Sequence, residues 1–305
     1  MHSSAQLSPI PLSTTSTIRD YVSLMKPGVM SLVVFTGFAG MAVAPGSLHP
    51  FQYVMALACI ALASGAGAAI NMWYDRDIDA IMRRTQHRAV AAGRIAPDDA
   101  LALGLFMAAL SVMLMGLALN WLAAGILAFA IFFYAVVYTM WLKRSTPQNI
   151  VIGGAAGSFP PLIGWAAVTG DVTLYPIILF AIIFLWTPPH FWALALYKNE
   201  DYTKAGVPMM PVVCGDAKTK TMMMLYTWLL AATTLSLPLL GFSGVLYAVS
   251  ALLLGAVFLY HVYGVLTDPT HGWAKKTFGF SILYLFMLFS ILVADHLWFQ
   301  PLIIL

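Results

Sequence analysis

Long runs of this chain contain no Asp, Glu, Lys or Arg, and they limit the folds open to it more than any other feature. These charge-free runs cover 27–74, 100–142, 145–170, 172–197 and 221–267, and a further apolar segment extends from about Thr277 to Trp298. A helix needs about 20 apolar residues to cross a bilayer. The three longest runs therefore predict two helices each and the other segments one each, giving an all-α integral membrane protein of about nine transmembrane helices.

The composition excludes a soluble globular protein. Of the 305 residues, 61% are hydrophobic and only 9% are charged. Soluble domains carry about 25% charged residues, so this chain could not cover a water-facing surface. Its two cysteines, Cys59 and Cys214, support neither a disulfide framework nor a thiolate metal site.

The positions of the basic residues predict the orientation. If the chain crosses the membrane at each predicted helix, every Lys and Arg falls on one side, which receives the N-terminal tail and the segments 75–99, 143–149, 198–220 and 268–276. The positive-inside rule makes that side cytoplasmic. The short chain, without a transit-like leader, predicts a bacterial inner-membrane protein with a cytoplasmic N-terminus. We expect a disordered or interfacial tail over 1–25 and a single membrane domain over 26–305.

The first polar segment begins with a regular row of oxygen-bearing side chains. Asn71, Asp75 and Asp79 recur every four residues, which predicts one face of a helix. Carboxylate and amide oxygens suit Mg²⁺, which commonly completes its shell with water and substrate phosphate. The alternative is a solvated helix end whose acids pair with nearby arginines such as Arg83 and Arg84.

Two further charged groups are predicted at the same membrane surface. Glu200 and Asp201 form a second acidic pair beside Lys198, and Lys143 and Arg144 end a predicted helix. If the polar loops face each other, acids and cations together could hold a diphosphate and neutralise it as it leaves. A solvated loop and simple positive-inside anchoring are the alternatives.

Two histidines are candidates for iron ligation. His190 lies in an apolar predicted helix after Pro188 and Pro189, and His87 lies in the first polar segment. A lone histidine inside a membrane is more often a satisfied polar contact than a metal ligand, and both readings stay open.

Four stretches carry a resemblance to a known family: NMWYDRDIDAIMRRTQHR, LKRSTPQNIVIGGAAGSFPPLIGWAAVTG, TPPHFWALAL and EDYTKAGVPMMPV. They resemble the UbiA-type membrane prenyltransferase superfamily, and within it the branch that attaches a farnesyl chain to heme b. The resemblance implies farnesyl diphosphate as donor, heme b as acceptor, Mg²⁺ as cofactor, the lipid bilayer as surroundings and a heme A synthase as partner.

The resemblance also implies roles for individual residues. Asn71, Asp75 and Asp79 would hold Mg²⁺ and diphosphate, and Lys143 and Arg144 would neutralise the leaving group. The other implied catalytic or substrate-binding residues are Lys198, Arg83, Arg84, Glu200, Asp201, Tyr202, His190 and His87.

In one place the chain departs from the family pattern. Lys198 and Tyr202 stand where the second acidic motif of the superfamily has its acids, with Glu200 and Asp201 one step away. Either a second Mg²⁺ binds there, or Lys198 contacts the diphosphate directly.

Other functions remain possible from the sequence. A sister transferase would prenylate a quinone-precursor ring in place of heme. A transporter would place ionisable groups near mid-membrane, whereas these lie at one face. A protein that only binds or delivers heme would not need the Asn71–Asp75–Asp79 row.

Overall fold

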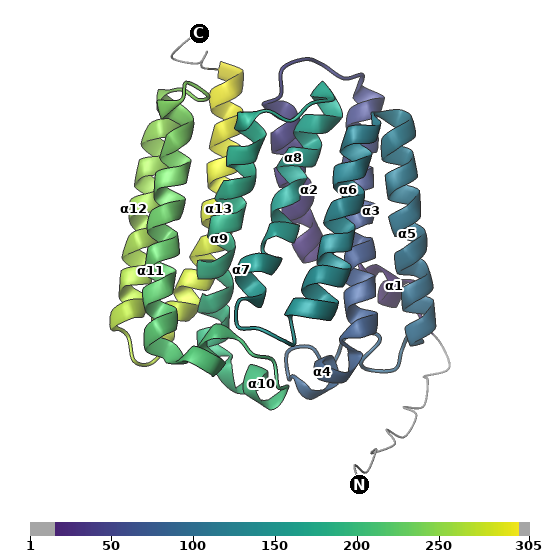
Figure 1. Cartoon of the computed structure of the whole chain (residues 1–305), viewed down its shortest axis with the longest axis vertical. Coiled ribbons are helices and arrows are strands. Elements are labelled where there is room, and N and C mark those ends of the chain that lie inside the picture. The colour runs from purple at the N-terminus through teal and green to yellow at the C-terminus, as the bar shows by residue number, and fades with distance from the viewer. Residues whose placement is uncertain (1–15, 299–305) are drawn as a thin grey trace.

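All regular secondary structure in residues 16–298 of the computed structural model is helical, and Figure 1 shows an upright bundle. In chain order the elements are α1 (Ile18–Leu24), α2 (Pro27–Ala42), α3 (Pro50–Tyr74), α4 (Arg76–Ile81), α5 (Pro97–Ala118), α6 (Trp121–Phe132), the π-helix η1 (Phe133–Leu142), α7 (Asn149–Gly153), α8 (Ala155–Thr169), α9 (Leu174–Tyr197), α10 (Asn199–Lys204), α11 (Met210–Leu239), α12 (Val245–Thr267) and α13 (Gly272–Trp298). The predicted all-helical fold is confirmed. Most of the tail predicted over 1–25 lies outside the described residues, and its described end contains α1.

The helix lengths agree with a membrane protein. Within residues 16–298, eight helical segments are long and apolar enough to cross a bilayer, and α1 with α2 forms a ninth candidate, bent by 51°. Large apolar side chains cover the outside of the bundle; Leu117 is 71% exposed and Leu239 is 81% exposed. Such a surface is suited to lipid. The prediction of about nine spans is confirmed as eight or nine.

Two helix starts differ from the predicted ones. α11 begins at Met210, not near 221, and continues past a bend at Gly215, where φ is 76°. α13 begins at Gly272, not near 277. The charge-free runs mark the part of a helix that crosses lipid, and helical geometry continues into the polar segment beyond it. The loop predicted over 198–220 is correspondingly shorter and contains α10.

The close packing of α2 on α8 depends on small residues. A Cβ atom added at Gly164 would lie 2.1 Å from the backbone oxygen of Gly37, and one added at Gly40 would lie 2.1 Å from that of Pro161. Glycine lets the two backbones approach to this distance, as is common between membrane helices. This contact holds α2 against α8, although the two helices are far apart in sequence.

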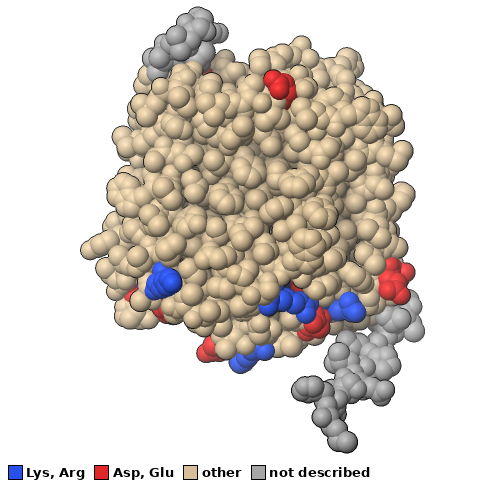
Figure 2. All heavy atoms as spheres, in the orientation of Figure 1, with Lys and Arg blue, Asp and Glu red and all other residues tan. Residues whose placement is uncertain are grey.

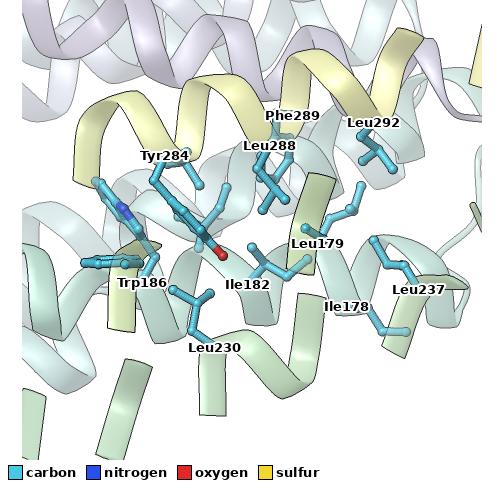
Figure 3. Close-up of a cluster of buried hydrophobic side chains, with 14 of the residues drawn as sticks. Ile178, Leu179, Ile182, Trp186, Leu230, Leu237, Tyr284, Leu288, Phe289 and Leu292 are labelled. Carbon is cyan, nitrogen blue, oxygen red and sulfur yellow. The ribbon is translucent and has the colours of Figure 1, made fainter. Parts of the chain in front are cut away.

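Each half of the bundle has its own apolar core. One core is formed by α2, α3, α5, α6 and α8, and the other mainly by α9, α11, α12 and α13. Figure 3 shows the second core, in which Ile182 and Trp186 of α9 lie near Leu230 of α11 and Tyr284 of α13. The end of α9 packs into the second core through Trp192 and Leu196, and the end of α3 packs into a separate cluster through Ala69 and Met72.

Charged residues gather at one end of the bundle. The Lys and Arg side chains visible in Figure 2 lie near the end that carries α4 and α10 in Figure 1. The segments 27–99 and 145–220 each contain long apolar helices followed by a short polar one: α4 follows α3, and α10 follows α9. This shared order of elements places both polar segments at the same end.

Candidate active site

The row Asn71, Asp75 and Asp79 lies at the junction of α3 and α4. Asp75 ends α3 and precedes α4, so the row crosses a short break between helices and does not follow a single one. The spacing survives because the backbone N–H of Asp79 still donates to the carbonyl of Asp75, at 2.8 Å. All three side chains are buried, and Asn71 Nδ2 donates to Asp75 Oδ2 at 2.7 Å.

Lys143 and Arg144 reach this row from the end of η1. Lys143 Nζ donates to Asp75 Oδ2. Arg144 lies 3.4 Å from Asp75 Oδ1 and forms two 2.7 Å hydrogen bonds with the carboxylate of Asp77. The structure therefore brings together the predicted acids of the first polar segment and the predicted cations, although they are far apart in sequence.

Arg88 is a site residue that the sequence reasoning did not single out. Its guanidinium Nη1 donates to both carboxylate oxygens of Asp79, at 2.8 and 2.7 Å. Arg83 and Arg84, which were favoured from the sequence, are exposed. Arg88 lies in a series of turns after α4, where no helical period indicates which side chain faces inward.

Lys26 is the second such residue. It stands between α1 and α2 with a left-handed φ of 49°, and its Nζ donates to Asn71 Oδ1 at 2.8 Å. Thr139 of η1 accepts a 3.2 Å hydrogen bond from Asn71 Nδ2. The only signal in the sequence was the basic character of Lys26, since its contact joins residues from separate helices.

The site gathers basic side chains around its acids. Arg88, Lys143 and Arg144 contact the carboxylates of Asp75, Asp77 and Asp79, and Lys26 contacts Asn71 beside them. Arg144 Nε is also buried without a hydrogen-bond partner, which is costly for a donor. An anionic ligand would satisfy this free donor.

The pair formed by Asp77 and Arg144 lies outside the membrane-spanning helices. The hydrogen bond from Arg144 holds the pKa of Asp77 below its ordinary value. The same contact raises the pKa of Arg144 above its ordinary value. Both groups therefore stay charged across the physiological range.

The donor set of the row fits Mg²⁺. Asn71, Asp75 and Asp79 offer the hard oxygen ligands that Mg²⁺ prefers, and the cations that contact Asp75 and Asp79 mark positions where positive charge is stabilised. Within residues 16–298, no three His, Cys, Asp or Glu side chains converge on one point. Two carboxylates and an amide could supply part of a Mg²⁺ shell, which water and a substrate phosphate would have to complete.

The π-helix η1 forms one wall beside the row. Its rings Tyr134 and Tyr138 are stacked, with centroids 5.6 Å apart. Each ring occupies space beside a glycine: a Cβ at Gly67 would lie 2.7 Å from the Tyr134 ring, and one at Gly153 would lie 2.1 Å from the Tyr138 ring. π-Helical segments are rare and often occur at functional sites. Here the segment places aromatic rings immediately before Lys143.

The second polar segment contributes Tyr202 to this end of the bundle. Tyr202 is buried and packs with Ile78 and Met82, so the two polar segments meet. Burial raises the pKa of Tyr202, while the nearby Arg84 acts in the opposite direction.

The other charged residues of that segment are not brought to the row. Glu200 is 88% exposed at its side chain and faces Lys204 at 3.8 Å. Asp201 is half-buried, and Lys198 lies over the ring of Tyr197. Within the described part of the chain, none of these three makes a hydrogen bond or ion pair with the row.

The two candidate histidines have different surroundings. His190 is buried in α9, stacked between Trp186 at 4.3 Å and Phe278 at 4.6 Å, and its Nδ1 lies 2.6 Å from Ser281 Oγ. His87 is exposed, and its backbone oxygen accepts from Arg94. Only His190 has a fixed, enclosed imidazole.

The fold and this site define a class: a multi-pass membrane protein with a cluster of acidic and basic side chains at one end of its helix bundle. A family model described as the UbiA prenyltransferase family matches residues 33–300, and the chain belongs to this family.

Curated relatives resemble the chain over nearly its whole length. A protein named protoheme IX farnesyltransferase from Sinorhizobium fredii is 55% identical over 300 residues, covering 97% of this chain and 94% of the relative. One of the same name from Rhizobium johnstonii is 58% identical over 286 residues, covering 92% and 90%.

Solved structures share the fold at much lower identity. A digeranylgeranylglyceryl phosphate synthase has a TM-score of 0.76 at 18% identity, covering 92% of this chain and 98% of that one. A UbiA homolog from Archaeoglobus fulgidus bound to GPP and Mg²⁺ has a TM-score of 0.66 at 16% identity, covering 90% and 99%. These likenesses support the helical architecture described above.

Proposed function

We propose that this protein transfers the farnesyl group of farnesyl diphosphate to a vinyl group of heme b, with addition of water, and so produces heme O and diphosphate. The observation that carries the proposal is the identity of more than half the residues shared with protoheme IX farnesyltransferases over nearly the whole chain. The buried acidic and basic site at the end of α3 is the chemistry that such a donor requires.

The diphosphate end of the donor binds at the basic side chains of the site. Lys143, Arg144 and Arg88 are placed to contact phosphate oxygens, and Asn71, Asp75 and Asp79 would hold Mg²⁺. When bound there, Mg²⁺ supplies further neutralisation of the diphosphate charge. Fixed positive groups around a leaving anion are usually the largest contribution to catalysis of this kind.

The reaction then follows from charge separation in an apolar space. The bond between C1 of farnesyl and the diphosphate oxygen breaks, and the electron pair leaves with the diphosphate. The vinyl π electrons of heme form the new carbon–carbon bond to C1. Water adds to the resulting cation and releases a proton. The rings of Tyr134 and Tyr138 keep bulk water from the first cation.

We assign the acceptor side to the region of His190. Its imidazole is enclosed by aromatic rings and lies in α9, about two helical turns from the polar end. Iron ligation by His190 would hold heme in this region. Tyr202 of the second polar segment packs with Ile78 of α4, and it is placed to contact substrate together with the nearby Arg84 of the first polar segment.

The alternatives lack a supporting observation of their own. The charged site lies at the junction of α3 and α4, at one end of the bundle (Figure 1), away from mid-membrane where a transporter would need it. A quinone-precursor transferase would share the fold and the donor site but would have no use for an enclosed imidazole.

We further propose that the protein lies in a bacterial inner membrane, with its polar segments on the cytoplasmic side and one membrane domain over 26–305. A heme A synthase would then use the product as its substrate.

A single incubation tests donor, acceptor and metal together. Membranes containing the protein are incubated with heme b, farnesyl diphosphate and Mg²⁺, with and without EDTA. The hemes are then extracted, and their masses are measured by mass spectrometry. We expect a heme heavier by farnesyl plus water that is absent with EDTA. Consumption of the donor with phenolic acceptors but no mass shift of heme would move the protein to the quinone-precursor branch.

Asp75→Asn and Asp79→Asn test the row. Each variant removes a carboxylate that would hold Mg²⁺, and losing one preorganised group that stabilises a developing anion lowers kcat by about 10²–10³-fold, so each variant should lose nearly all turnover. The control is Asp171→Asn, an exposed acid between α8 and α9, which should retain full activity. Normal turnover in both row variants would remove the row from the mechanism.

A further inference from the structure

Among the described residues, the ring of His190 forms its hydrogen bond with Ser281 of α13. Its Oγ lies 2.6 Å from His190 Nδ1 and also 2.7 Å from the backbone oxygen of Phe278. Ser281 is fully buried. The faces of the imidazole are covered by Trp186 and Phe278, so the ring cannot turn away from Ser281 without breaking both stacks.

The two contacts of Ser281 Oγ determine which ring nitrogen of His190 carries a proton. A hydroxyl has one proton to donate, and a carbonyl oxygen can only accept. If the proton of Ser281 goes to the Phe278 oxygen, the hydroxyl oxygen must accept from His190 Nδ1. The neutral imidazole then carries its proton on Nδ1, and Nε2 keeps a free lone pair.

A second contact fixes the position of Ser281 along α13. Trp186 Nε1 donates to the backbone oxygen of Ser281 at 2.8 Å. Trp186 lies one turn before His190 on α9, so the same pair of helices is joined at the backbone and at the side chain of Ser281. Sliding of α13 along α9 would break both hydrogen bonds.

We propose that Ser281 is a positioning residue for heme binding: it holds His190 in the tautomer whose Nε2 can ligate iron. The inference rests on the proposed function, which assigns heme to His190. A hydrogen-bond acceptor behind a ligating imidazole sets its tautomer and orientation, and losing such a partner typically weakens metal binding about 10–100-fold.

The test is a titration of purified, detergent-solubilised protein with ferric heme b, followed by resonance Raman spectroscopy of the ferrous form. Ser281→Ala should weaken heme binding about 10–100-fold and diminish the iron–histidine stretching band. In turnover assays KM for heme should rise while KM for farnesyl diphosphate stays constant. Ser281→Thr, which keeps the hydroxyl, should restore binding.

The chain offers a matched control in Ser111. It is fully buried, and its Oγ donates to the backbone oxygen three residues earlier, as that of Ser281 does, but without a histidine beside it. Ser111→Ala should leave heme affinity unchanged. If Ser281→Ala does not fold, Ser281→Cys keeps most of the volume with a poor acceptor, and it should fold and bind heme weakly.

The outcomes separate this inference from the proposed function. If His190→Ala leaves heme affinity and the iron–histidine band unchanged, His190 is not the ligand and both proposals about this ring fail. If His190→Ala removes the band while Ser281→Ala and Ser281→Cys retain both band and affinity, the role of Ser281 is wrong and that of His190 stands.

Discussion

At the residue scale, the site depends on charges that are buried in pairs. Asp79 is nearly inaccessible and has Arg88 as its cation, while Asp75 has Lys143. The sequence was sufficient to select Asp75, Asp79 and Lys143, because ionisable residues at a membrane boundary are rare and stand out. It could not select Arg88, because the turns after α4 have no period that orients side chains.

For the buried pair Arg88–Asp79, removing one partner should destabilise the fold more than replacing both partners. Arg88→Ala leaves a buried carboxylate alone, which costs about 3–5 kcal/mol, and the partly accessible Arg88 favours the lower end. Arg88→Ala with Asp79→Asn should recover at least half of that loss. Thermal unfolding in detergent measures both variants. The exposed pair Lys204–Glu200 is the control, because breaking such a pair should change the free energy of unfolding by only about 0–1 kcal/mol. Equal losses in the single and double variants would contradict the burial of the pair.

The Asp77–Arg144 pair predicts a pH dependence. Because the folded pKa of Asp77 is below its ordinary value, its ionised form stabilises the fold. This stabilisation is complete above the ordinary pKa of about 3.9 and is lost as pH falls through the lower folded value. The difference in melting temperature between the wild type and Asp77→Asn should therefore be constant from about pH 7 to 5 and shrink below about pH 4. Glu200→Gln should show no comparable difference at neutral pH.

At the element scale, charge-free runs predicted which segments are helices but not how they bend or pack. Hydropathy reports the cost of placing a residue in lipid, so the long helices were predictable. Two features depend instead on contacts with neighbouring helices: the break between α3 and α4 at Asp75, and the π-helical hydrogen bonding of η1. The predicted single face of Asn71, Asp75 and Asp79 was therefore only approximately right: the spacing is kept, but across two helices.

The α2–α8 contact gives a prediction at this scale. Gly164→Ala places a methyl group 2.1 Å from the Gly37 backbone oxygen, and overpacking of this kind costs about 1–3 kcal/mol. We expect a lower melting temperature in detergent. Gly157→Ala, on the same helix, has nothing within 4 Å of the new Cβ and should be neutral or slightly stabilising. A comparable loss at Gly157 would show that the loss at Gly164 does not come from its close contact with Gly37.

At the scale of the whole molecule, the sequence predicted one polar end because all Lys and Arg fall on one side of the threaded chain. Figure 2 agrees with this for the face it shows. The meeting of the two polar segments at Tyr202 is a property of the assembled bundle, in which α4 and α10 come from separate halves. No pattern within either segment could have indicated it.

Orientation can be tested with two exposed positions at opposite ends. In a Cys214→Ser background, Lys204→Cys and Asp171→Cys are treated in intact bacterial cells with a thiol reagent that does not cross membranes. The positive-inside rule predicts labelling at 171 and none at 204 until the cells are opened. Labelling at 204 in intact cells would reverse the proposed orientation. Cys59 is buried and should not react.

The π-helix η1 also bears on how the chain tolerates insertions and deletions. Its hydrogen bonds join residues five apart, as from Lys143 N to Tyr138 O, so it accommodates more residues per turn than an α-helix. Deleting one residue within 133–142 would let the segment revert to α-helix and rotate Tyr138 and Lys143 relative to α3, with almost no change in hydropathy. In related sequences, single-residue deletions should therefore be rarer within this apolar segment than in the turn between α5 and α6.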